Sequence, residues 1–144
     1  TVTKGLDGLS KRLRNYYEQG ARFAKWRAVI DIADGIPTWT CIKSNAHALA
    51  RYARICQQEQ IVPIVEPEVL MDGDHDIDTC YQVTEWVLKE TFMQLYYQKV
   101  ALEGIVLKPN VAVPPMPKPR RTLCASLYEA ATAKLPKLYL PPRA

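Results

Sequence analysis

The chain has 144 residues, enough for one ordinary domain with a hydrophobic core. Its 48% hydrophobic and 24% charged residues exclude a disordered chain, and no apolar run approaches the roughly 18 residues that span a membrane. The net charge of +4 arises in residues 109–144, which hold six basic residues and Glu129, whereas residues 1–108 hold 13 basic and 14 acidic residues.

Helical and strand-like patterns alternate along the first half of the chain. The spacing of leucine and tyrosine predicts a helix over residues 6–20, which Gly20 ends. The aromatic and β-branched run at 21–32 predicts a strand. A turn at 35–37 leads into a helix over 40–60 that has an apolar face.

The second half repeats this alternation. Residues 61–70 predict a strand buried on both sides, as in a parallel sheet. A polar turn follows, in which Asp76 or Asp78 caps a helix that runs through 83–99. The run at 103–113 predicts a third strand.

Strands that alternate with helices predict βαβ units and a parallel sheet. The repeat is regular, with 41 residues from Lys25 to Glu66 and 42 from Glu66 to Lys108. This interval suits a (β/α)₈ barrel and an open doubly wound sheet equally, although the absence of GxGxxG and GxxxxGK[ST] disfavours nucleotide-binding versions. A complete barrel needs about 250 residues. We therefore expect an incomplete α/β fold of about three βα units preceded by a helix.

Each predicted strand carries charged residues that a purely structural strand would lack. Lys25 and Arg27 share one face of the first strand, and Glu66 and Glu68 share one face of the second, because side chains alternate along a strand. Lys108 closes the third strand. Active sites of parallel α/β folds lie at the carboxyl ends of the strands, so we expect all five side chains to converge there.

This set of residues fits Schiff-base chemistry. A neutral amine attacks a carbonyl, and a second cation nearby or partial desolvation favours the neutral form, a role that Lys25 can play for Lys108. Glu66 is suited to moving protons, and the planar fork of Arg27 is suited to a phosphate. A structural ion-pair cluster without catalysis is the open alternative.

The remaining polar and thiol groups indicate no cofactor. The aspartates of residues 72–78 lack the glycine position and closing glutamate of an EF-hand, which favours a solvated turn. Four cysteines without a CxxC pair favour reduced thiols over zinc, and residues 1–17 lack the apolar stretch of a secretory signal. Aromatic stacking platforms for nucleic acid are missing too. We expect a cytoplasmic protein that binds neither nucleic acid nor a membrane.

At these residues the sequence resembles the class I fructose-bisphosphate aldolases, the bacterial branch most of all. The stretches FAKWR, VPIVEPE and VLKPN carry the resemblance, which extends over residues 1 to about 113. It implies a (β/α)₈ barrel that reversibly cleaves fructose 1,6-bisphosphate, a sugar phosphate, without a metal or other cofactor. By resemblance, Lys108 forms the Schiff base, Glu66 transfers protons and Lys25 binds substrate beside them. Arg27 then matches a phosphate-side arginine and Glu68 a supporting carboxylate.

The resemblance covers only the central part of the family's barrel. We expect residues 1–113 to be a central aldolase-type segment and residues 114–144 to be a diverged, proline-rich and basic tail with a weak helix. Family residues on earlier and later strands have no match in the 144 residues. Two hypotheses follow: a glycolytic aldolase or its catalytic central segment, or a truncated, non-catalytic partial barrel that serves as an interaction or assembly module or is a degenerate gene product. We expect weak or no cleavage activity from this chain alone, and a homo-oligomer if it folds.

Overall fold

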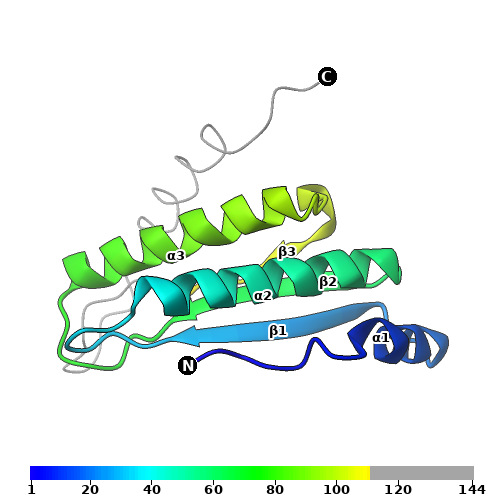
Figure 1. The fold of residues 1–144 in the computed structure, drawn as a ribbon, viewed down its shortest axis with the longest axis horizontal. Coiled ribbons are helices and arrows are strands. Elements are labelled where there is room, and N and C mark those ends of the chain that lie inside the picture. Colours follow the sequence, from blue (N-terminus) through cyan, green and yellow to red (C-terminus); the bar gives the residue numbers. More distant parts are fainter. Residues whose placement is uncertain (111–144) are drawn as a thin grey trace, which may run out of the picture.

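The computed structural model describes residues 1–110, and Figure 1 shows the arrangement of their elements. No helix among these residues has an apolar stretch long enough to cross a membrane. The elements are, in chain order, α1 (Leu9–Glu18), β1 (Phe23–Ile30), α2 (Trp39–Gln58), β2 (Val62–Val69), α3 (Ile77–Tyr97), the 3₁₀ helix η1 (Leu102–Gly104) and β3 (Val106–Leu107).

The three strands form one parallel sheet in the order β1-β2-β3, and α2 and α3 make the two crossovers between them. Both helices lie along one face of the sheet, while α1 packs near the amino end of β1 (Figure 1). We call the opposite face, which α2 and α3 leave uncovered, the open face. It carries Lys25 and Arg27 of β1 and Glu66 and Glu68 of β2, because the side chains between them point toward the helices.

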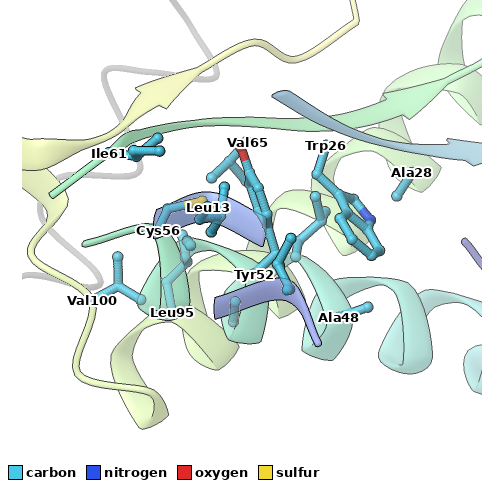
Figure 2. Packing of buried hydrophobic residues seen from close by; sticks show 14 residues of the cluster. Leu13, Trp26, Ala28, Ala48, Tyr52, Cys56, Ile61, Val65, Leu95 and Val100 are labelled. Carbon is cyan, nitrogen blue, oxygen red and sulfur yellow. The ribbon is translucent and has the colours of Figure 1, made fainter. Parts of the chain in front are cut away.

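The hydrophobic core lies between the sheet and the helices (Figure 2). Trp26 of β1 and Val65 of β2 meet Tyr52 and Cys56 of α2 there, and the rings of Trp26 and Tyr52 lie 5.4 Å apart. Burial raises the pKa of the Cys56 thiol to about 11. The same alternation that buries these side chains places the charged residues on the open face.

Tyr52 also connects α2 to the sheet through its hydroxyl. The group donates to the Ala24 carbonyl at 2.5 Å, and the side chain is 1% exposed. Tyr52→Phe should lower the free energy of unfolding in urea by about 1–3 kcal/mol, because it leaves a partly buried carbonyl without this donor. The exposed Tyr16→Phe is the control and should change it by no more than about 0.5 kcal/mol. Equal effects from the two variants would contradict this role for the hydroxyl.

Side-chain caps set where the two crossover helices begin. The Thr38 hydroxyl accepts from the Cys41 N–H at 3.2 Å, and Asp76 accepts from the Thr79 N–H at 2.8 Å. The bond from Thr79 lowers the pKa of Asp76. Of the two aspartates predicted as caps, Asp76 is the one used, so α3 starts at Ile77.

The third strand is shorter than predicted. The run 103–113 was expected to be extended, but η1 occupies its first residues and β3 contains only Val106 and Leu107. Regular pairing with β2 ends at Leu107, and the N–H of the next residue, Lys108, still donates to the Val65 carbonyl at 2.9 Å. Residues 111–113 and the predicted tail at 114–144, with its weak helix, lie outside the described residues.

Candidate active site on the open face

Glu66 is the centre of a three-residue charge cluster on the open face. Its Oε2 lies 2.9 Å from the Lys25 Nζ, and its Oε1 accepts a hydrogen bond from the Lys108 Nζ. The Glu66 side chain is only 2% exposed, whereas those of Lys25 and Lys108 are 49% and 55% exposed. One buried carboxylate therefore lies between two amines that solvent and small molecules can reach.

These three residues come from three strands, but not all of them from strand ends. Lys108 directly follows β3, as expected from the sequence. Lys25, in contrast, is the third residue of β1, and Glu66 is the fifth residue of β2. The predicted convergence is present, because Lys25 pairs in register with Ile64 and its long side chain extends to Glu66. The expectation that all the groups lie at strand ends is wrong for β1 and β2.

Arg27 and Glu68 form a second ion pair beside the first cluster. The Arg27 Nε donates to the Glu68 Oε2, and this bond raises the pKa of Arg27 above its ordinary value. The Arg27 side chain is 49% exposed and that of Glu68 is 23% exposed. The guanidinium is thus held by one carboxylate while part of its surface stays open to an anion.

The two lysines determine the charge state of Glu66. Burial by itself would raise the pKa of the carboxyl, but the hydrogen bond from Lys108 and the interaction with Lys25 outweigh burial, so the pKa lies below 4.5. Glu66 is therefore ionised at neutral pH. A carboxylate in this state accepts a proton from an adjacent amine or from a bound hydroxyl group.

The geometry suits amine chemistry on a carbonyl compound. Lys108 offers an exposed amine, the Glu66 carboxylate touches it directly, and Lys25 contacts the other oxygen of the same carboxylate. No group of three or more His, Cys, Asp or Glu side chains within residues 1–110 is arranged to hold a metal ion. Of the polar stretch 72–78, residues 72–76 lie between β2 and α3 and include the cap Asp76, and the last two residues belong to α3.

Asn110 was not predicted as a site residue, yet it fixes the chain just after Lys108. Its Oδ1 accepts from the Val69 N–H at 3.2 Å, and its Nδ2 donates to the Thr84 hydroxyl at 3.2 Å. The available signal was an amide residue immediately after a proline at the end of a strand. An amide side chain carries both an acceptor and donors, so it is able to bond a backbone N–H and a hydroxyl at the same time.

The chain is similar to known proteins over the segment that carries these site residues. The family described as "Glycolytic: Fructose-bisphosphate aldolase class-I" matches residues 1–143. The "Probable fructose-bisphosphate aldolase class 1" of Xanthomonas campestris pv. campestris is 62% identical over 112 residues, which cover 78% of this chain and 34% of that protein. "Fructose-bisphosphate aldolase, cytoplasmic isozyme 2" of Pisum sativum is 54% identical over 120 residues, which cover 83% of this chain and 33% of that protein.

A solved structure has a similar fold. It is fructose-bisphosphate aldolase from Plasmodium falciparum in complex with TRAP and a small molecule inhibitor, with a TM-score of 0.83 and 44% sequence identity. The match covers 98% of this chain and 41% of that one. The fold implied by the family resemblance, an incomplete (β/α)₈ barrel, is confirmed by this likeness. The chain spans about a third of the length of the curated relatives it matches.

Proposed function

Because the chain belongs to the class I fructose-bisphosphate aldolase family, we propose that its open face carries the Schiff-base part of an aldolase site. The reaction is the reversible, glycolytic cleavage of fructose 1,6-bisphosphate into dihydroxyacetone phosphate and glyceraldehyde 3-phosphate, so the protein is an aldehyde-lyase. The observation that carries this proposal is the buried Glu66 carboxylate in contact with both the Lys25 and the Lys108 amines.

Lys108 is the nucleophile in this mechanism. Its amine, after passing a proton to Glu66, attacks the keto carbon of the sugar phosphate and forms a carbon–nitrogen bond. A second proton passes from the nitrogen to the former carbonyl oxygen, and the resulting hydroxyl leaves as water when Glu66 returns the first proton, which gives a cationic imine. The cationic imine then accepts the electron pair of the bond between the α and β carbons, which breaks to leave an enamine on Lys108 and to release the β carbon as an aldehyde. The proton lost from the β-hydroxyl in this step goes to a base in a part of the family's barrel that these 144 residues do not match. The direct contact between Lys108 and Glu66 supports this assignment, since proton transfer requires hydrogen-bond reach.

The other three residues bind and orient the substrate. Lys25 keeps Glu66 ionised and adds positive charge where the carbonyl oxygen develops negative charge. Arg27 is the group for a substrate phosphate, and Glu68 holds its guanidinium in place. The half-exposed Arg27 side chain supports this role, because a phosphate has access to it.

We further propose a cytoplasmic location and self-association. The relative named as a cytoplasmic isozyme supports the first. The second is supported by the sheet: within residues 1–110, β1 and β3 each pair along one side only, and unpaired strand edges favour association. Cleavage of the bisphosphate by these 144 residues alone should be weak or absent, because groups from other strands of the family's barrel have no counterpart among them.

Trapping with borohydride tests the proposal. The protein is incubated with dihydroxyacetone phosphate, the imine is reduced, and the adduct is located by peptide mass spectrometry. We expect a single stable adduct on Lys108. Absence of an adduct in protein that circular dichroism shows to be folded would overturn the proposal and support the non-catalytic partial barrel. Measured cleavage of fructose 1,6-bisphosphate by the isolated chain would contradict only the expectation of weak activity.

A further inference from the structure

The side chain of Asn110 joins the end of β3 to two other elements. It accepts from the backbone N–H of Val69, the last residue of β2, and donates to the hydroxyl of Thr84 on α3, each at 3.2 Å. Val69 is 0% exposed and Thr84 is 7% exposed, so both partners are buried, while Asn110 itself is partly buried. A single amide thus fastens the segment after Lys108 to both the sheet and the helix layer.

This contact replaces part of the strand ladder. The register of β2 with β3 pairs Ile64 with Val106 and Val65 with Leu107, and the Lys108 N–H still donates to the Val65 carbonyl at 2.9 Å. Regular pairing between the two strands ends there. The Val69 N–H is a buried donor that needs an acceptor. The Asn110 Oδ1 supplies one from a side chain.

These hydrogen bonds fix the backbone on both sides of Lys108. Its side chain is long, flexible and 55% exposed, so its own packing does not determine where the amine lies. The position of Lys108 is instead fixed through its backbone. Its own N–H donates to the Val65 carbonyl, and two residues later the Asn110 side chain accepts from the Val69 N–H. We infer that Asn110 is a positioning residue for Lys108, which holds the lysine backbone where the amine contacts Glu66. This inference rests on the function proposed above for Lys108.

The chain offers a matched control in the segment that leads into the amino end of β3. Gln57 of α2 also makes two amide hydrogen bonds to this segment: its Nε2 donates to the Ala101 carbonyl at 2.8 Å, and its Oε1 accepts from the Ala101 N–H at 3.0 Å. Gln57→Ala therefore removes the same number of bonds as Asn110→Ala, but at a point well before Lys108. The two variants separate positioning of Lys108 from general stabilisation of β3.

The experiment compares the two variants by two readouts. The first is the rate of adduct formation at saturating dihydroxyacetone phosphate with borohydride. Asn110→Ala should lower this rate by about tenfold or more, because small displacements of a reacting group are costly. Gln57→Ala should lower the melting temperature to a similar extent while leaving the rate close to that of the unaltered chain.

The second readout does not depend on the reaction. The ¹³C signal of the Glu66 carboxyl is followed as a function of pH. In Asn110→Ala the pKa of Glu66 should rise, because Lys108 no longer holds the carboxylate in its charged form while burial remains. Gln57→Ala should leave the titration unchanged. Thr84→Val, which removes only the hydroxyl contact, should shift both readouts in the same direction by a smaller amount, and it decides the question if Asn110→Ala fails to fold.

Equal losses of rate in Asn110→Ala and Gln57→Ala, or an unchanged Glu66 titration in Asn110→Ala, would overturn the inference. If the unaltered chain forms no adduct, the proposed function fails by itself. The Glu66 titration then still decides whether Asn110 positions Lys108.

Discussion

Lys108→Met is expected to abolish the borohydride-trapped adduct with dihydroxyacetone phosphate completely. Methionine matches the lysine stem in length but has no amine, so the carbon–nitrogen bond cannot form. The Lys108 side chain is 55% exposed, and its main contact is the ion pair with Glu66. The variant should therefore fold, and the mass of the intact protein after reduction should equal that of the untreated chain.

Two further lysine variants make this result specific. Lys25→Met removes the other amine that contacts Glu66. It should still form an adduct on Lys108, more slowly, because Lys25 supplies charge near the carbonyl and does not form the bond. Lys43→Met alters an exposed lysine of α2 and should behave as the unaltered chain. An adduct that persists in Lys108→Met and disappears in Lys25→Met would reverse the two assigned roles.

Glu66→Gln should slow adduct formation by about 10²- to 10⁴-fold, the usual contribution of a general acid–base group. Glutamine still accepts a hydrogen bond from Lys108, but it cannot take the proton from the amine or return it to the departing water. Glutamine fills nearly the same volume, so the buried position remains occupied. The rate of trapping, followed by mass spectrometry over time, measures this effect.

The matched control is Glu59→Gln at the contact between α1 and α2. Glu59 accepts hydrogen bonds from Arg14 and Ser10 and, like Glu66, binds more than one partner. Its substitution should reduce stability without changing the rate of adduct formation. If both glutamine variants slowed trapping equally, the effect of Glu66→Gln would reflect stability and not proton transfer.

The same carboxylate also gives a pH dependence with a definite sign. The pKa of Glu66 in the folded chain lies below its ordinary value of 4.5, because the favourable interactions with Lys108 and Lys25 exceed the effect of burial. Its contribution to stability is therefore present above about pH 4.5 and is lost as the pH falls through the folded-state pKa. Urea unfolding below pH 5 should show that Glu66→Gln lacks this part of the acid-induced loss of stability. An identical pH dependence in both proteins would contradict the lowered pKa of Glu66.

The amino-acid sequence by itself determined which residues share a face. The two-residue period of a strand puts Lys25 with Arg27 and Glu66 with Glu68 whatever the rest of the chain does. Hydrophobic periodicity similarly indicated the helices. The density of apolar residues at 61–70 indicated a strand buried on both sides, as in a parallel sheet. These properties are local, since each depends on neighbours within one turn of helix or a few residues of strand.

The tertiary structure alone decided which charges touch. Lys25 is level with Ile64 and not with Glu66, so the pairing of Lys25 with Glu66 depends on strand register and on the reach of a four-carbon side chain. Likewise, only the packing of β3 beside β2 makes Glu66 the common partner of both lysines. Contacts between residues about 40 positions apart follow from how strands and helices dock, and no local pattern encodes that docking.

The early end of β3 and the role of Asn110 illustrate the same division. Pro109 was visible in the sequence as a residue that stops a strand. That the Val69 N–H takes its acceptor from a side-chain amide two residues beyond Lys108 follows only from the position of β2 and α3. The residue types at the site were thus set by sequence, whereas their distances and hydrogen bonds were set by the packing of separate elements.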